Sequence, residues 1–336
     1  MARKNSRASP PPHPPPRPPH KPHSKAHGTP RATAWCSAAS FTVVLLALLA
    51  ASLRPAPALA PHRHLAAAAA EGDGAGGEAC LNIAHLWDGR NATAPLGCEG
   101  FVRHYWEVAP RLSFAGAEFS NSLMRLGDIR SMLRTFRFRI HKNHGTVVLQ
   151  EPGSGFLADR RWSRGDDVPA DIVEIALREM RTLVLHNLEV YWPAVAAFTR
   201  DVVRFFHTYT QVNLYFSPAG LRVATSPHQD AHCVFIVQLH GAKRWHVHAP
   251  LSTQLTLKGL QRGKFGEILS SDDRALMGPA LVNATLRPGS VLYVPRGFFH
   301  HTSTDPAALA APGVFADAST HTDVAETREG VAHAVV

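Results

Sequence analysis

Residues 226–245 read SPHQDAHCVFIVQLHGAKRW. His228 and Asp230 stand one residue apart, so in an extended chain their side chains point to the same side. An almost unbroken apolar run follows and ends at Gly241 and Lys243. A polar pair at the mouth of such a strand can be two ligands for one metal ion, or it can be only a polar strand end. The surrounding sequence has to decide between these alternatives.

The region after residue 211 has the character of a β-sheet protein. Short β-branched or aromatic segments, broken by Gly and Pro, predict strands at 211–218, 233–241, 242–250 and 285–297, and after Ala311. Upstream, apolar residues at helical spacing predict helices at 100–110, 126–139, 171–180 and 194–209, with a strand at 182–188. Helices followed by many short strands predict an α+β fold with a small antiparallel barrel or sandwich.

A third ligand is expected from another strand. The stretch LRPGSVLYVPRGFFHH, residues 286–301, reads as a turn, an apolar strand and a second turn that ends at His300 and His301. Two histidines and one carboxylate with an open side are the arrangement of non-heme Fe(II) oxygenases. A closed zinc site would need a fourth protein ligand. We therefore expect a metal centre that combines His228 and Asp230 with one histidine of this pair.

Other histidines also occur at spacings that are found in metal sites, but with less support from their surroundings. His321 and Asp323 repeat the His-x-Asp spacing near the chain end, where little strand is left to hold them. His246 and His248 imitate a metal-binding His-x-His pair, but we interpret them as ordinary strand residues.

Four motifs then occur in a fixed order: N-L-Y-F-S-P, P-H-x-D, F-x-x-Q-L-x-G-x-K-x-W and P-G-x-x-L-Y-x-P-R-G-x-x-H. In this order and spacing they resemble the JmjC/cupin-type ribosomal oxygenases, over roughly residues 100–305. That family consists of 2-oxoglutarate-dependent histidyl hydroxylases, some of which are also described as histone lysine demethylases. The resemblance implies a double-stranded β-helix barrel (jelly-roll/cupin, JmjC-type) preceded by helices.

The resemblance also implies the ligands and the reaction. The Fe(II) ligands would be His228, Asp230 and His300, since His300 and not His301 falls at the family position after the PRG turn. The expected activity is hydroxylation of a protein side chain, with O₂ and 2-oxoglutarate consumed and succinate and CO₂ formed. Two alternatives stay open: a lysine demethylase that uses the same chemistry, and a non-catalytic, membrane-tethered cupin-like binding module.

The family resemblance also implies which residues contact 2-oxoglutarate. The resemblance implies that Lys243 binds the distal carboxylate of 2-oxoglutarate, with Asn213 and Tyr215 helping from the preceding strand. A lysine on a neighbouring strand offers a compact positive charge to a dicarboxylate.

The distribution of charge argues against a nucleic-acid partner. The net charge is +9, but residues 1–70 carry nine Lys and Arg and no acidic residue. The remaining residues therefore hold 35 − 9 = 26 basic and 26 acidic side chains. No basic face is expected, so we predict no direct nucleic-acid binding. A protein substrate is what the family resemblance implies. The oligomeric state is left open.

The N-terminal region predicts a membrane or secretory protein. The expected parts are a Pro-, His- and Arg/Lys-rich tail (1–31), an uncharged apolar segment (32–53), a linker (54–79), a helical lead-in with first strands (80–210) and the barrel (211–336). Residues 32–53 are long enough to cross a bilayer, and the preceding positive charges predict a signal-anchor with a cytosolic N-terminus. The alternatives are a cleaved signal or transit peptide, or no anchor and a nuclear, nucleolar or organellar protein.

Two further features agree with a secretory localisation. Asn91 and Asn283 each begin an Asn-Ala-Thr glycosylation sequon. Cys80 and Cys98 bracket a short loop and could pair in an oxidising compartment.

Overall fold

The computed structural model describes residues 74–90, 95–140, 147–150, 165–251, 261–264, 269–310 and 331–335 of the chain. The chain divides into two compact units, residues 1–57 and 58–336, and every described residue belongs to the second. The predicted tail and the apolar segment 32–53 therefore lie outside the described residues. The first described helix already begins at Gly74, inside the segment predicted as a linker.

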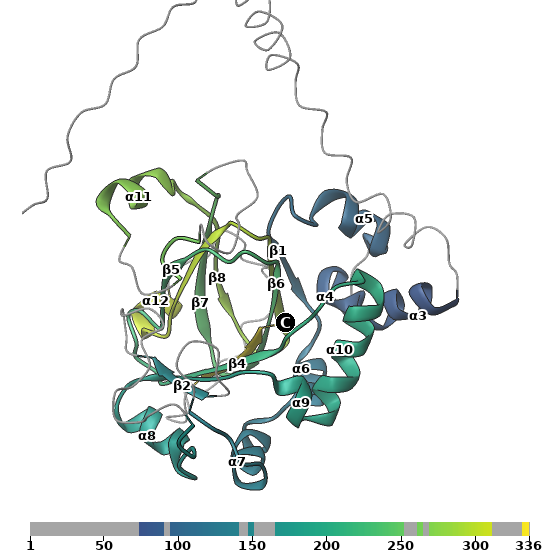
Figure 1. The fold of residues 1–336 in the computed structure, drawn as a ribbon. Helices are drawn as coiled ribbons and strands as arrows, with labels where there is room; N and C mark the ends of the chain where they lie inside the picture. The colour runs from purple at the N-terminus through teal and green to yellow at the C-terminus, as the bar shows by residue number, and fades with distance from the viewer. Residues whose placement is uncertain are drawn as a thin grey trace, which may run out of the picture. The chain divides into compact units, whose positions relative to one another are not determined.

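Two antiparallel sheets form the centre of the molecule (Figure 1). The larger sheet has the order β1-β9-β6-β11-β4-β3-β2 and the smaller one β5-β10-β7-β8. The strands of the larger sheet are β1 (Arg111–Phe114), β9 (Ser290–Val294), β6 (Val234–His240), β11 (Val331–Val335), β4 (Asn213–Ser217), β3 (Thr182–Leu185) and β2 (Val147–Gln150). Those of the smaller sheet are β5 (Thr225–His228), β10 (Phe299–Ser303), β7 (Lys243–His248) and β8 (Ala280–Leu286).

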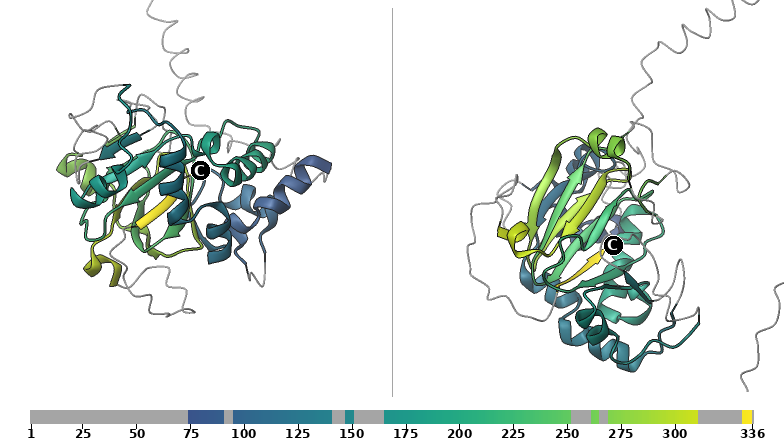
Figure 2. Two further views of the ribbon diagram at one scale, coloured as in Figure 1. Left: turned by 90° about the horizontal axis from the view of Figure 1, so that it is seen from below. Right: turned by 90° about the vertical axis from the view of Figure 1, so that its left-hand side faces the viewer.

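The helices lie outside the sheets. They are α3 (Gly74–Ile83), α4 (His85–Asp88), α5 (Gly97–His104), α6 (Ala117–Leu123), α7 (Leu126–Thr135), α8 (Ile172–Arg178), α9 (Leu188–Tyr191), α10 (Pro193–Phe206), α11 (Ser271–Leu276) and α12 (Pro306–Ala310). Figure 1 and the left view of Figure 2 show α3, α5 and α10 on one side of the barrel and α11 and α12 on the other. The predicted α+β double-stranded β-helix, preceded by helices, is confirmed.

The inner core lies between the two sheets. Alternate residues of the facing strands contribute it, because side chains of a strand alternate between its two faces. The larger sheet provides Val234, Ile236, Leu292 and Val294, and the smaller sheet provides Trp245, Val247, Val282, Ala284 and Leu286. All of these side chains are almost completely buried, so the barrel interior near them is a packed core rather than a channel.

The other face of the larger sheet carries the helices. Phe235 on β6 and Tyr293 on β9 point away from the barrel interior and join Trp87, Phe101 and Phe206 from the helices. The ring centroids of Phe101 and Tyr293 are 5.1 Å apart, and those of Phe235 and Tyr293 are 4.9 Å apart. Strand β6 is thus apolar on both faces, which explains the nearly unbroken apolar run after Asp230.

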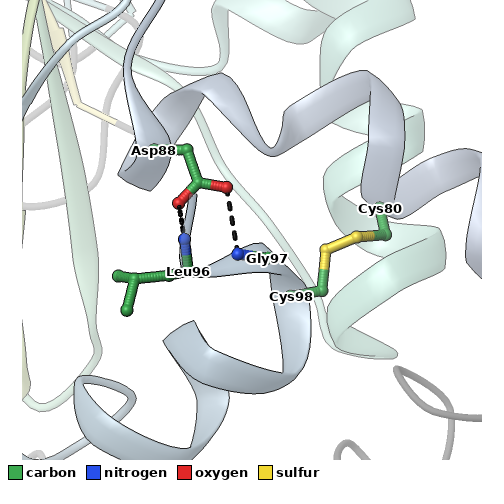
Figure 3. Close-up of a disulfide and its surroundings, with 5 residues drawn as sticks. All are labelled: Cys80, Asp88, Leu96, Gly97 and Cys98. Carbon is green, nitrogen blue, oxygen red and sulfur yellow. Dashed lines mark hydrogen bonds between the residues drawn. A yellow bond between two sulfur atoms is a disulfide. The ribbon is translucent and has the colours of Figure 1, made fainter. Parts of the chain in front are cut away.

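A disulfide and an aspartate organise the helices at the start of the described region (Figure 3). Cys80 of α3 and Cys98 of α5 form a disulfide with their Cα atoms 6.2 Å apart, as their spacing predicted. The Asp88 carboxylate accepts hydrogen bonds from the backbone N–H groups of Leu96, at 2.6 Å, and Gly97, at 3.1 Å. These bonds satisfy donors at the beginning of α5 that the helix itself leaves unpaired.

Candidate metal centre

The predicted ligands meet where β5 and β10 lie side by side. These strands pair in antiparallel register with His300 directly opposite His228. The two imidazole rings face each other with their centroids 4.3 Å apart. Asp230 follows β5 by two residues, and the backbone N–H of Gly297 donates to its carbonyl oxygen at 2.8 Å. The PRG turn before β10 is thereby attached to the end of β5, which brings the carboxylate to the histidines.

Backbone contacts determine which imidazole nitrogen is offered by each histidine. The Nδ1 atom of His228 lies 2.8 Å from the carbonyl oxygen of Ser226, and Nδ1 of His300 lies 3.2 Å from that of Phe298. Because a carbonyl oxygen can only accept, Nδ1 is the protonated nitrogen in both rings. In both rings the lone pair is therefore on Nε2, and a neutral imidazole in this form can bind a metal.

The carboxylate of Asp230 completes the cluster. Its Oδ2 atom lies 3.9 Å from Nε2 of His228 and 3.5 Å from Nε2 of His300. One ligand atom from each of the three residues lies within 4.8 Å of the other two, and all three side chains are buried. Among the described residues, this is the one group of His, Cys, Asp and Glu with such geometry.

The charge state of the cluster suits a divalent cation. Burial lowers the pKa of His228 well below its ordinary value and also lowers the pKa of His300. Burial by itself would raise the pKa of Asp230, but Lys264 and the neighbouring histidines reverse this and lower it overall. Two neutral imidazoles and one ionised carboxylate result. This donor set of two nitrogens and one oxygen fits Fe(II) with open coordination positions.

The residues predicted to bind 2-oxoglutarate line the interior face of the sheets. Asn213 and Tyr215 share one face of β4 with Ser217, whereas Leu214 and Phe216 join the helix-facing core. Lys243 is completely buried at the start of β7, and its Nζ donates to Ser217 Oγ at 2.7 Å. Burial lowers the pKa of Lys243 to about 7.

Asn213 and Tyr215 differ in their surroundings. The Oδ1 atom of Asn213 lies 3.1 Å from both Nδ1 of His186 and Nε2 of Gln211. Tyr215 lies close enough to the cluster that the charges of Lys264 and Asp230 act on it, and burial raises its pKa. The structure thus places Tyr215 near the three candidate ligands and Lys243 against Ser217.

Two polar residues of this region were not predicted from the sequence. Ser217 could have been found, since it continues the alternation of Asn213 and Tyr215 along one strand. Lys264, whose Nζ lies 2.5 Å from Asp230 Oδ1, gave no signal because it follows a polar segment without periodicity.

Three other histidines of the smaller sheet lie together on its strands β7 and β10. His246 and His301 stack with ring centroids 4.4 Å apart and an interplanar angle of 6°. His301 follows His300 directly, so it occupies the opposite face of β10. His248 stacks on His301 with centroids 5.7 Å apart. These three rings are not part of the candidate metal cluster, and His321 and Asp323 lie outside the described residues.

Comparisons with known proteins agree with this fold. Residues 190–322 match the JmjC domain family. The "bifunctional lysine-specific demethylase and histidyl-hydroxylase NO66" of Aedes aegypti is 26% identical over 216 residues, which are 63% of this chain and 32% of that protein. The Drosophila persimilis protein of the same name is 32% identical over 63% of this chain and 29% of its own. "Ribosomal oxygenase 1" of Gallus gallus is 26% identical over 64% of this chain and 34% of its own.

Solved structures that resemble the chain include E. coli ycfD, with 18% identity, a TM-score of 0.40 and coverage of 70% of this chain and 51% of that one. The predicted resemblance to the JmjC/cupin-type ribosomal oxygenases is confirmed by the family match and the curated relatives. The chain spans about a third of the length of these relatives.

The predicted localisation at a membrane or in the secretory pathway is wrong. Within the described ranges, no helix is long and apolar enough to cross a membrane, and the relatives are named as ribosomal oxygenases and demethylases. Residues 32–53, on which the prediction relied, are outside those ranges, as is Asn91. The other sequon does not support the prediction either, because Asn283 lies within β8 and its Oδ1 accepts a hydrogen bond from Arg244 Nε at 2.7 Å.

Proposed function

We propose that this chain is an Fe(II)- and 2-oxoglutarate-dependent oxygenase that hydroxylates a protein side chain. The observation that carries the proposal is the convergence of His228 Nε2, His300 Nε2 and Asp230 Oδ2 at a buried strand end. Both imidazoles are held in the metal-binding tautomer by backbone carbonyls. An arrangement of this kind at a strand end inside a JmjC barrel supports metal binding with an open face.

The three ligands would hold the metal through one face only. Fe(II) bound there supplies the activation of O₂ and of 2-oxoglutarate. In the overall reaction, one oxygen atom of O₂ enters a substrate C–H bond as a hydroxyl group, and the other enters succinate while the C1 carboxylate leaves as CO₂. The protein supplies orientation and a site shielded from water, since all three ligands are buried.

Lys243 would pair with the distal carboxylate of 2-oxoglutarate. It is completely buried on the interior face of the barrel, where a single fixed positive charge can bind a dicarboxylate. Ser217 holds its ammonium group in place. Tyr215 would donate a hydrogen bond to a co-substrate oxygen from the same face of β4, and Asn213 would line that face further along the strand.

The substrate class follows from the relatives, whose names describe a histidyl hydroxylase, a lysine-specific demethylase and a ribosomal oxygenase. We propose a side chain of a ribosomal or other protein as the substrate of this chain. Removal of an N-methyl group from lysine uses the same chemistry and is the second candidate, because the relatives' names include it.

The test measures succinate formed from 2-oxoglutarate by the full chain with Fe(II), with and without a mixture of ribosomal proteins. We expect turnover in the wild type and none in His300→Ala, because the latter loses a ligand. His301→Ala is the matched control, since this neighbouring ring lies on the opposite face of β10 and should leave turnover intact.

Products separate the candidate reactions. Addition of one oxygen atom to a protein, detected by mass spectrometry, supports hydroxylation, whereas release of formaldehyde from methylated lysine supports demethylation. A wild-type protein that binds metal and 2-oxoglutarate but forms no succinate would contradict the proposal and favour a binding module.

A further inference from the structure

The segment 261–264 is attached to the strand end that carries the ligands. The backbone N–H of Gln229 donates to the carbonyl oxygen of Arg262 at 3.0 Å. In return, the Arg262 backbone N–H donates to Gln229 Oε1 at 3.3 Å, and Gln261 Nε2 donates to the Gln229 carbonyl at 3.4 Å. Gln229 stands between His228 and Asp230 in sequence, so these bonds join the segment directly to the candidate ligands.

Gly263 brings the two backbones into contact. Its φ is +73°, and a Cβ atom at this position would lie 2.2 Å from the carbonyl oxygen of Pro227 and 3.1 Å from the Cα of His228. Only glycine permits so close an approach. The close contact at Gly263 therefore holds the backbone just before Lys264 against the strand that carries the ligands.

Lys264 reaches the carboxylate of the candidate metal centre. Its Nζ lies 2.5 Å from Oδ1 of Asp230, and the side chains of Lys264 and Asp230 are 19% and 7% exposed. The other oxygen, Oδ2, is the one that faces Nε2 of His228 and His300. The two carboxylate oxygens therefore have separate partners: one faces a buried ammonium group, and the other faces the imidazoles.

We propose that Lys264 is a positioning residue of the metal centre: it holds Oδ1 of Asp230, leaves Oδ2 as the carboxylate oxygen offered to the metal, and lowers the affinity for divalent cations. The inference rests on the proposed function, because it assumes that the cluster binds a metal. Its physical basis is that an ammonium group balances the buried Asp230 charge but repels a divalent cation bound to the same carboxylate.

Two opposite effects follow from this arrangement. Without metal, Lys264 stabilises the fold by pairing with a buried carboxylate, so its removal should lower the melting temperature. With metal, the dication takes over the role of counter-charge, so removal of Lys264 should strengthen metal binding. A residue with a merely structural role would lower stability without tightening metal binding.

The experiment measures Co(II) binding to the full chain by isothermal titration calorimetry and thermal unfolding with and without Co(II). For Lys264→Met we expect a lower melting temperature without metal and a Co(II) Kd that is smaller by at least about tenfold. Lys264→Gln, which keeps a hydrogen-bond donor without the charge, should show the same direction and serves if the methionine variant does not fold. Lys264→Arg should retain the wild-type affinity.

Arg262→Met is the matched control. It removes a cation from the same segment, but Arg262 pairs with Asp273, at 2.6 Å, rather than with a candidate ligand. Its Co(II) affinity should equal that of the wild type. An unchanged or weaker affinity in Lys264→Met and Lys264→Gln would overturn the inference while leaving the proposed function intact. A wild-type chain that does not bind Co(II) would overturn both.

Discussion

At the scale of single residues, burial makes the charge of Lys243 depend on pH near neutrality. Its ammonium group is completely buried and donates to Ser217 Oγ, which lies 3.0 Å from Thr182 Oγ1. Thr182 in turn donates to the carbonyl oxygen of Ala224 at 3.1 Å. This chain of hydroxyl groups holds Lys243 in position without neutralising it. Because burial lowers its pKa to about 7, the residue loses its proton near neutral pH.

Binding of 2-oxoglutarate should therefore depend on pH. A dicarboxylate favours protonated Lys243, so binding must include proton uptake once the pH exceeds the lowered pKa of about 7. We expect the Kd for 2-oxoglutarate to rise by about tenfold per pH unit above that point. Calorimetry of the Co(II)-loaded protein at several pH values measures this, and Lys243→Met should bind weakly without the dependence. A wild-type Kd that is constant over this range would show that Lys243 does not carry the charge.

The lowered pKa of Lys243 also makes the free energy of unfolding depend on pH. The unfolded chain retains the lysine proton up to its ordinary pKa of 10.5, whereas the folded chain releases it near pH 7. Between these values the unfolded state binds more protons, so the contribution of Lys243 to the free energy of unfolding rises with pH. Below the lowered pKa the full cost of burying the charge is present.

At the scale of elements, the segment 261–264 and strand β5 behave as one unit. Hydrogen bonds from Gln261 and Arg262 to Gln229 connect them, and Gly263 sits against the backbone of Pro227. The ligand strand is short and lies at the edge of the smaller sheet, so pairing with β10 is its one strand contact among the described residues. The 261–264 segment therefore supports the side of β5 that no described strand covers.

Replacement of Gly263 by alanine should separate these elements. The new Cβ would collide with Pro227 and would also strain a backbone with positive φ, so we expect a loss of about 3 kcal/mol in the free energy of unfolding. Gly278→Ala is the control: its φ is also positive, at +64°, but no atom lies within 4 Å of the added Cβ. There the loss should be about 1 kcal/mol. Urea unfolding measures both, and equal losses would contradict the role of the close contact.

At the scale of the whole molecule, the helices and the larger sheet of the barrel share one hydrophobic core. Trp87 stacks on Phe101 with ring centroids 4.5 Å apart, and Trp106 stacks on Phe206 with centroids 4.4 Å apart. These rings continue onto Tyr293 of the larger sheet. Because aromatic side chains bury large apolar areas, the contact stabilises the sheet that carries β4 and the predicted co-substrate residues.

The disulfide should stabilise this helical part and, through the shared core, the barrel. Cys80 and Cys98 close a loop with a sequence separation of 18, and loss of such a crosslink costs about 3 kcal/mol in the free energy of unfolding. We expect this loss in the double variant Cys80→Ser, Cys98→Ser, measured by urea unfolding. The wild type with reductant should match the variant without it. A variant as stable as the oxidised wild type would show that the crosslink adds no stability.

The elements that were predicted correctly are those with a strong local pattern. Strands β4, β6, β7 and β9 and helices α7 and α8 fall within the segments predicted from their apolar patterns, and α10 begins one residue before its predicted segment. Strand β1 was missed because it has four residues and lies directly after a helical pattern. Strand β8 was missed because its alternation, ALVNATL, was interpreted only from Thr285 onward. Short strands gain stability from their neighbours, so their own residues indicate them weakly.

The sequence by itself determined the fold class, the JmjC resemblance and the three candidate ligands: alternation along an extended segment places His228 and Asp230 on one side, and the resemblance implies His300 rather than His301. Only the tertiary structure decided how these residues meet: the pairing of β5 with β10, the backbone carbonyls that select Nε2, and the ion pair from Lys264 to Asp230. The physical reason is sequence distance. Each of these contacts, apart from the local bonds to carbonyls, joins segments that are far apart along the chain. A local sequence pattern does not predict which distant residue a polar side chain will contact.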